Sequence, residues 1–319
     1  KRQPISTYRS QNRGGRGVQG MGTHDDDYVK ELLSTSTHDY LLFFTNNGKL
    51  YQNKAYTMPE YGRTAKGLPI VNIIEIAQDE EISAIIPVKE FNENEFLFFA
   101  TRTGVVKRTT LSAFGNIRTN GLIALSLRED DELIGVRKTT GSNDIVIASS
   151  GGKLVWFEED QVRSMGRTAA GVRGINLEEG EVAVGMEIVT EDQEILIVSE
   201  KGFGKRTPIR EYRKTSRGGK GVKTINITDK NGSLVAMKTV TGEEDLLIVT
   251  NKGIIIRTPI SQISQTGRAT QGVTLIRLTD DQFVSSVALV EHEEEHTEEL
   301  ATEKVENTEA SEILLEEKE

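Results

Sequence analysis

The chain has 319 residues, of which 36% are hydrophobic and 6% aromatic, with no cysteine and a formal net charge of −10. The lack of cysteine excludes disulfides and thiolate metal sites and fits a reducing compartment. No apolar run approaches the roughly 18 residues that a membrane span needs, and the start does not resemble a signal peptide. We therefore expect a cytoplasmic protein without a membrane anchor. Because the chain begins with lysine, we also expect it to be part of a longer protein.

The negative charge is concentrated at one end. Residues 291–319 hold 13 acidic residues and two lysines, whereas residues 1–290 are nearly neutral. Such charge runs are usually solvated and disordered. We predict a folded body over residues 1–290 and an acidic, disordered tail over residues 291–319.

A seven-residue segment recurs along the body, and we call its copies box 1 to box 6. Residues 1–17 align without gaps on residues 205–221, with 10 of 17 positions identical. The boxes end at glycines that follow one another at nearly equal intervals, namely Gly17, Gly67, Gly121, Gly171, Gly221 and Gly272. Six copies at one period indicate a repeat architecture.

Each repeat has the same elements in the same order. A box is followed by a short β-rich run, an acidic turn, a second strand and a hairpin. The first hairpin arms are apolar and are predicted at 40–45, 95–100, 144–149, 194–199 and 245–250. The second arms are predicted at 49–53, 105–109, 153–157, 203–207 and 254–258. Their turns carry Gly48, Gly104, Gly152, Gly202 and Gly253, which supply the positive φ that two-residue hairpin loops require.

Four strands and about 50 residues per repeat are the size of a propeller blade. We predict an all-β fold of six four-stranded blades around a common core. Only five hairpins are complete, because Lys1 and Arg2 match the second arm at Lys205 and Arg206. We expect the first and last blades to pair across this gap or to leave an open ring.

Basic residues recur in the boxes and in the second hairpin arms, and the acidic turns follow several residues later. The strand between them would place the two charge types on opposite edges of a blade. A periodic row of arginine and lysine suits the phosphate backbone of duplex DNA, bound without reading of the bases. The candidate DNA contacts are Arg13, Arg16, Arg63, Lys66, Arg108, Arg118, Arg167, Arg206, Arg217, Lys220, Arg257 and Arg268.

Other interpretations of the same residues stay open. Some box arginines would bridge neighbouring blades through ion pairs instead of contacting DNA. The glycines from Gly15 to Gly20 have G-x-G-x-x-G spacing, but no strand and helix flank them as in a nucleotide site. His24 with Asp25–Asp27 suggests a metal, yet acidic turns recur in every repeat. We find no catalytic constellation and predict no metal site.

Box 1, "QNRGGRG", resembles the seven-residue box, usually QRRGGKG, of a family formed by the C-terminal domains of the DNA gyrase A subunit. The likeness extends over residues 1 to about 290. The matching positions are Gln11, Asn12, Arg13, Gly14, Gly15, Arg16 and Gly17. Asn12 replaces an arginine, which puts that one contact in doubt, and Arg16 replaces a lysine with its charge kept.

The resemblance implies a six-bladed β-pinwheel whose blades exchange strands with their neighbours. It also implies right-handed wrapping of double-stranded DNA, so that strand passage introduces negative supercoils. The partners implied are the gyrase B subunit, together with the rest of the A subunit, in an A2B2 complex at the nucleoid. ATP and Mg²⁺ would be held by the B subunit, whereas the cleavage tyrosine would lie in another domain of the A subunit. We therefore expect a monomeric, non-catalytic fragment without a cofactor.

Two other functions compete with DNA wrapping. One is a propeller scaffold for protein interactions, which would rarely repeat basic residues before a glycine along one edge. The other is a propeller enzyme with a central active site, which the lack of convergent catalytic residues disfavours.

Overall fold

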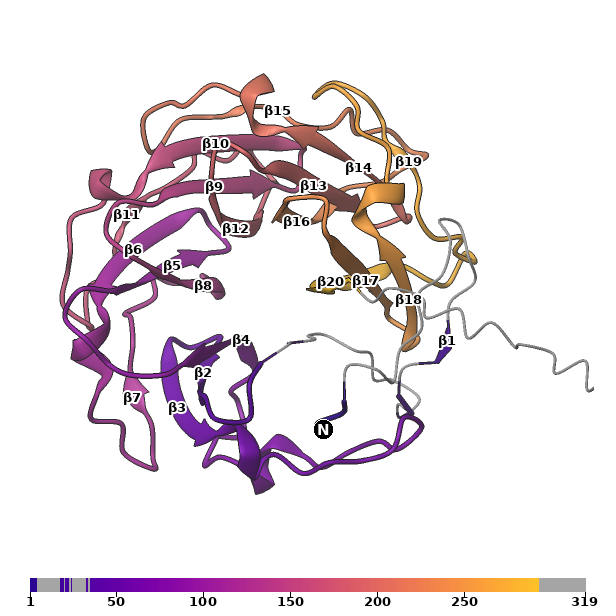
Figure 1. Ribbon diagram of the computed structural model, residues 1–319. Coiled ribbons are helices and arrows are strands. Elements are labelled where there is room, and N and C mark those ends of the chain that lie inside the picture. The colour runs from indigo at the N-terminus through magenta and orange to yellow at the C-terminus, as the bar shows by residue number, and fades with distance from the viewer. Residues whose placement is uncertain (5–17, 20, 23, 25–32, 34, 293–319) are drawn as a thin grey trace, which may run out of the picture.

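The computed structural model describes residues 1–4, 18–19, 21–22, 24, 33 and 35–292 (Figure 1). Box 1, Asp25–Asp27 and the acidic residues from 293 onward lie outside the described residues. Within them the structure contains five four-stranded antiparallel sheets, which we call blades 1 to 5 in the order of their hairpins. The all-β, propeller-like architecture predicted from the repeats is thus confirmed.

Each blade is built from an inner strand, two hairpin arms and an outer strand. The inner strands are β4 (Ile82–Val88), β8 (Leu133–Thr139), β12 (Ala183–Val189), β16 (Leu234–Val240) and β20 (Val284–Glu291). The first arms are β2 (Tyr40–Thr45), β5 (Phe96–Thr101), β9 (Asp144–Ser149), β13 (Glu194–Ser199) and β17 (Glu244–Thr250). The second arms are β3 (Lys49–Lys54), β6 (Val105–Thr110), β10 (Lys153–Glu158), β14 (Phe203–Pro208) and β18 (Ile254–Pro259). The outer strands are β7 (Leu122–Ile123), β11 (Val172–Arg173), β15 (Val222–Lys223), β19 (Val273–Thr274) and β1 (Val18–Gln19).

Short 3-10 helices follow the second arms and precede the boxes. They are η2 (Ala55–Thr57), η4 (Leu111–Phe114), η5 (Glu159–Gln161), η6 (Ile209–Glu211) and η7 (Ile260–Gln262). One further helix, η3 (Ile70–Asn72), follows box 2, where the repeat predicts a β-rich run.

The inner strands surround the centre of the disc and the outer strands lie at its periphery (Figure 1). The core lies between successive blades. Phe44 of blade 1, for example, packs edge-on against Phe99 of blade 2, with ring centroids 5.6 Å apart. The apolar first arms, such as β9 and β13, are almost wholly buried because both faces of the sheet are covered.

Four of the five outer strands belong to a later repeat than the hairpin they complete, and β1 comes from the first repeat. β7 follows box 3 and the hairpin of blade 2, but it pairs with β3 of blade 1. The same exchange adds β11 to blade 2, β15 to blade 3 and β19 to blade 4. The strand exchange implied by the resemblance is therefore present.

The predicted count of six blades is corrected to five four-stranded sheets in the described part of the chain. The first repeat supplies β1, which pairs with β18 of blade 5, and a bridge between Arg2 and Glu60. Lys1 and Arg2 occupy the place of a second arm, as predicted, but a blade needs both arms of a hairpin. The N-terminal residues thus connect blades 1 and 5, and a cavity of about 680 Å³ lies at this seam.

The hairpin turns are held by glycines with positive φ, as predicted, and three residues separate the two arms of each hairpin. Four of these turns also contact the repeat that lies two places later in the chain. The Gly104 carbonyl accepts a hydrogen bond of 2.7 Å from the Gly174 N–H, and a Cβ at Gly104 would lie 2.8 Å from Ile175. Equivalent bonds join Ala124 to Gly48, Thr224 to Gly152 and Leu275 to Gly202.

Three inner strands are joined by charged side chains near the axis. Glu187 of β12 accepts from Arg137 of β8 at 2.6 and 2.9 Å and from Lys238 of β16 at 3.2 Å. Burial alone would raise the pKa of Glu187, but the attraction of Arg137 and Lys238 outweighs it and lowers the pKa to about 2. This pairing ties blades 2, 3 and 4 together at the centre.

Candidate nucleic-acid interface

The boxes run along the outer edge of the disc. Box 4 follows β6 in the opposite direction, starting where the Met165 N–H donates to the Arg108 carbonyl at 2.8 Å. It ends at Gly171, whose φ of +95° and close approach to the Val106 carbonyl leave no room for a side chain. The chain then enters β11. The box is therefore the segment that carries the exchanged strand to the periphery.

The arginines of boxes 4, 5 and 6 join each of these boxes to the preceding blade. Nη1 of Arg167 donates to the Ile123 carbonyl at 3.1 Å, at the end of β7. Nη1 of Arg217 donates to the Arg173 carbonyl at 2.7 Å, and Nη1 of Arg268 to the Lys223 carbonyl at 3.0 Å.

The bridging role expected for some box arginines therefore exists, but its acceptors are carbonyls. In the described part of the chain no box arginine is within ion-pair distance of a carboxylate. Their positive charge is thus not neutralised by a carboxylate partner.

Other predicted cations are exposed at the same edge. Arg63, Lys66, Arg118 and Lys220 are exposed in or beside boxes 2, 3 and 5. Arg13 and Arg16, with the rest of box 1 (Gln11, Asn12, Gly14, Gly15 and Gly17), lie outside the described residues.

Two exposed cations at this edge were missed by the sequence analysis. Arg173 and Lys223 are the second residues of β11 and β15, and both are exposed while the residues before them are half-buried. The alternation of a two-residue strand directs every second side chain outward. The sequence signal is a basic residue two places after the box glycine.

The arginines of the second hairpin arms do not belong to this surface. Arg257 is 1% exposed and its Nε donates to Asp245 at 2.8 Å. Arg108 is mostly buried, with Nη1 3.6 Å from Glu159 and its guanidinium over the Phe96 ring.

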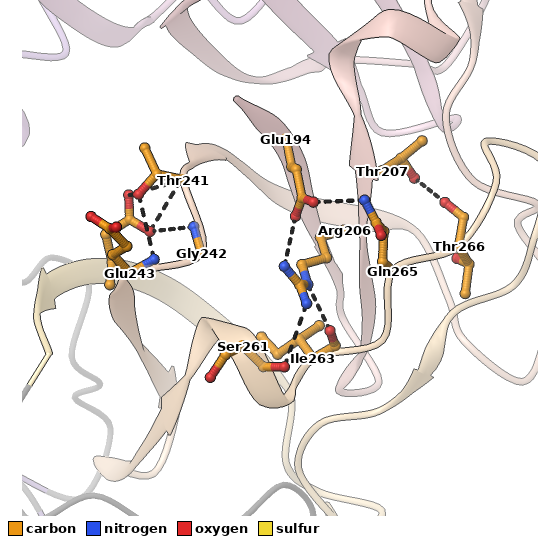
Figure 2. A network of polar contacts seen from close by, with 11 residues as sticks. Glu194, Arg206, Thr207, Thr241, Gly242, Glu243, Ser261, Ile263, Gln265 and Thr266 are labelled. Carbon is orange, nitrogen blue, oxygen red and sulfur yellow. Dashed lines mark hydrogen bonds and ion pairs between the residues drawn. The ribbon is translucent and has the colours of Figure 1, made fainter. Parts of the chain in front are cut away.

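Figure 2 shows the equivalent residue of blade 4. Arg206 donates to Glu194 at 3.0 Å and to the Ile263 carbonyl at 2.8 Å, and Gln265 donates to the same carboxylate at 2.7 Å. Arg108 and Arg206 thus fasten their hairpins to the segments before boxes 4 and 6, whereas Arg257 pairs within its own hairpin. Burial and pairing argue against the predicted DNA contacts of Arg108, Arg206 and Arg257.

The acidic turns lie at the hairpin-turn end of each blade and not on the edge opposite the boxes. Thr103, in the turn of blade 2, donates to Asp131 at 2.6 Å, and Lys201, in the turn of blade 4, donates to the Asp229 carbonyl at 2.5 Å. The separation of charges is therefore between the outer edge and one face of the disc.

Two lysines are buried beneath the boxes. Burial lowers the pKa of Lys107 to about 7, and the nearby Arg167 charge lowers it as well. Burial lowers the pKa of Lys205 to about 8, with Glu211 opposing and Arg268 adding to the shift. Neither ammonium can reach a ligand in solvent.

The described residues contain no group of three or more histidine, aspartate and glutamate side chains placed to hold a metal ion. None of their helices has the length and hydrophobicity needed to cross a bilayer.

The model of the family "DNA gyrase C-terminal domain, beta-propeller" matches six segments of the chain, at residues 1–36, 39–89, 95–140, 143–190, 193–241 and 244–291. The A subunit of DNA gyrase from Staphylococcus epidermidis is 54% identical over 299 residues, which cover 93% of this chain and 34% of that protein. The same subunit from Staphylococcus aureus strain MRSA252 is 55% identical over 314 residues, which cover 97% of this chain and 35% of that protein. The chain thus spans about a third of the length of these relatives.

Two solved structures have the same fold. One, titled "Structure of DNA gyrase A C-terminal domain", superposes with a TM-score of 0.82 at 28% identity and covers 91% of this chain and 95% of its own. The C-terminal domain of DNA topoisomerase IV superposes with a TM-score of 0.72 at 30% identity, covering 86% of this chain and 85% of its own. The family model, the relatives and the superpositions agree, and the chain belongs to the family of DNA gyrase C-terminal domains.

Proposed function

We propose that this domain binds duplex DNA along the outer edge of the disc and wraps it in a right-handed sense. The observation that carries the proposal is the row of exposed cations where boxes and outer strands meet. Arg217 is hydrogen-bonded to the backbone of Arg173, and Arg268 to that of Lys223, so the cations of neighbouring repeats are adjacent in space. A curved row of this kind follows a bent phosphate backbone without reading bases.

In a whole gyrase, the domain would hold a DNA segment for strand passage, so that the enzyme introduces negative supercoils. Cleavage would lie in the rest of the A subunit, and ATP and Mg²⁺ would be held by the B subunit of an A2B2 complex in the bacterial cytoplasm. The domain itself would contribute binding and bending of the DNA. Bending a 20–30 bp site by 40–90° costs on the order of 1–6 kcal/mol, which contacts from several blades would offset.

Binding measured across a salt series tests the electrostatic part of this proposal. Each neutralised phosphate adds about 0.9 to the slope of log K against log salt. Replacing both Arg173 and Lys223 by alanine should therefore lower the slope by about 2.

Lys252→Ala is the matched control, since Lys252 is exposed near Asp281 on the face with the acidic turns and not on the outer edge. We expect it to leave the slope unchanged. A wild-type domain that does not bind DNA at low salt would refute the proposal and favour a protein-interaction scaffold.

The hand of the wrap is tested by religating nicked circles on the domain. Right-handed wrapping predicts a positive change in linking number that grows with the amount of protein. A negative change, or none at saturating protein, would contradict the proposed role in supercoiling.

The acidic residues from 291 to 319 are proposed to compete with DNA for the cationic edge, because their net charge is opposite to that of the boxes. Deleting residues 293–319 should tighten DNA binding at low salt and have little effect at high salt, where charges are screened. Equal affinity with and without these residues at low salt would contradict the competition.

A further inference from the structure

The third position of the second hairpin arm differs between blades in a regular way. Lys107 in β6 and Lys205 in β14 are both 0% exposed. Lys1 takes the same place beside box 2, because the neighbouring Arg2 bridges to Glu60 just before that box. Arg108 bridges in the same way to Ser164 before box 4, and Arg206 to Gln265 before box 6. The corresponding positions of blades 1, 3 and 5 hold Tyr51, Val155 and Ile256. A lysine thus alternates with an uncharged residue from one blade to the next.

Each of these lysines donates to at least one backbone carbonyl of the box above it. Nζ of Lys205 donates to the carbonyls of Gly267 and Arg268 at 2.5 and 2.7 Å. Nζ of Lys107 donates to the carbonyls of Arg167 and Ala124, the latter at 2.6 Å.

The arrangement at box 2 is the same. Nζ of Lys1 donates to the carbonyls of Gly62, Arg63 and Ala65 at 2.9, 2.7 and 2.8 Å. In all three boxes the carbonyl of the box arginine is one of the acceptors.

The box sequences alternate together with the lysines. Boxes 2, 4 and 6, "YGRTAKG", "MGRTAAG" and "TGRATQG", have glycine and arginine at their second and third positions, and each lies on a lysine. Box 5, "TSRGGKG", lies on Val155 and its backbone is held differently. There Gly218 has a φ of +83°, and the Arg217 N–H donates to the Gln161 side chain at 2.8 Å. The lysine is therefore specific to the glycine–arginine boxes.

A buried ammonium is costly unless its protons are satisfied, so the carbonyls and the lysine constrain one another. In boxes 4 and 6 the arginine is fixed at both ends. Its carbonyl binds the buried lysine, and its guanidinium binds the outer strand of the preceding blade. Loss of the lysine would leave buried carbonyls without a donor and free the box backbone to move.

We propose that Lys107 and Lys205, and Lys1 by the same geometry, are positioning residues that set the direction of the box arginines at the DNA-binding edge. This inference rests on the proposed DNA binding. The lysines do not touch DNA themselves, because their side chains lie beneath the boxes.

The test uses the assembled enzyme, which contains the full-length A subunit, with nicked plasmid circles. Lys205→Met removes the ammonium but keeps the side-chain length. Ile256→Met is the matched control at the same position of blade 5, and Lys223→Ala removes an exposed cation beside box 6.

We expect Lys205→Met to weaken DNA binding by at least about tenfold, the size of a lost hydrogen bond to a charged group, with the salt slope unchanged. Lys223→Ala should lower the slope by about 1, and Ile256→Met should change neither quantity. Affinity equal to that of Ile256→Met overturns the proposal, and so does a slope lowered by about 1. If the wild-type enzyme does not bind DNA at all, the result refutes the proposed DNA binding itself and not the role of the lysines.

A measurement on the wild-type protein keeps the proposal testable if Lys205→Met does not fold. The charged groups that act on Lys107 and Lys205 are Arg167, Glu211 and Arg268. A box that lifts off its lysine returns the amine to water, where its pKa is higher than in the closed box. Opening of boxes 4 and 6 therefore takes up a proton, and it becomes less favourable as the pH rises.

Hydrogen exchange between pH 7 and 9, corrected for its intrinsic pH dependence, measures this linkage. Protection should increase in residues 165–171 and 266–272, which lie on the lysines. It should stay constant in residues 215–221, because box 5 lies on Val155. The same pH dependence in all three boxes overturns the proposal.

Discussion

Gly171, the last residue of box 4, permits a direct test of how the boxes pack on the preceding blade. Its φ is +95°, and an added Cβ would lie 2.3 Å from the Val106 carbonyl oxygen. Gly171→Ala therefore combines a left-handed backbone, which costs about 1–2 kcal/mol for an L-residue, with an overpacked contact worth about 1–3 kcal/mol. We expect a total loss of about 2–5 kcal/mol in the free energy of unfolding.

Two glycines in the same region provide controls. Gly180 has a similar φ of +79° but nothing within 4 Å of an added Cβ, so Gly180→Ala should show only the conformational cost of about 1–2 kcal/mol. Gly166 has an unrestrictive φ and open space, and its alanine variant should be neutral or slightly stabilised. Urea denaturation measures all three variants. Equal losses for Gly171→Ala and Gly180→Ala would refute the close approach of the box to β6.

Three further predictions concern buried charges. The pKa of Lys107 is lowered from 10.5 to about 7 in the folded protein. Between these two pH values the unfolded chain binds more protons than the folded chain, so the free energy of unfolding rises with pH. Lys107→Met should remove this rise when unfolding is measured at pH 7, 8 and 9. Arg257→Met leaves the Asp245 carboxylate buried without its guanidinium, and it should lower the denaturation free energy by about 3–5 kcal/mol without changing the salt slope of DNA binding. The pKa of Glu187 is lowered from 4.5 to about 2 in the folded protein. The ionised carboxylate therefore stabilises the fold above pH 4.5, and this stabilisation is lost as the pH falls toward 2. Glu187→Gln should make the melting temperature less dependent on pH in this acid range.

The hairpins could be predicted from the sequence because their signals are local. Apolar arms such as 194–199, a turn glycine such as Gly202 and the regular period of the repeats place all five hairpins where the structure has them. The pairing of the outer strands could not be derived in this way. Two residues such as Val172 and Arg173 carry no periodicity, and their partner β6 lies far earlier in the chain, before the whole hairpin of blade 3. Only the family resemblance indicated this exchange.

The arginines predicted to contact DNA fall into two groups, paired within the fold or placed at the outer edge, for a related reason. Arg206 and Arg217 have the same charge and lie close together in the sequence, and no composition argument separates them. Arg206 is fastened by Glu194 across the hairpin, whereas the box position of Arg217 places it at the outer edge. Burial and the distribution of partners depend on the folded arrangement of the blades. The sequence can predict a periodic row of cations, but not which of them are buried or paired within the fold.

The exchange of outer strands also bears on how such a chain gains or loses repeats. Every blade borrows its last strand from another repeat, so each junction between repeats has one donor and one acceptor. If one whole repeat is deleted between equivalent positions, the segment that donates an outer strand is joined to a segment that accepts one of the same kind. Every sheet then still has an outer strand to pair with. Recombination can therefore vary the length of the arc in whole units, and with it the arc of DNA that the rim would contact.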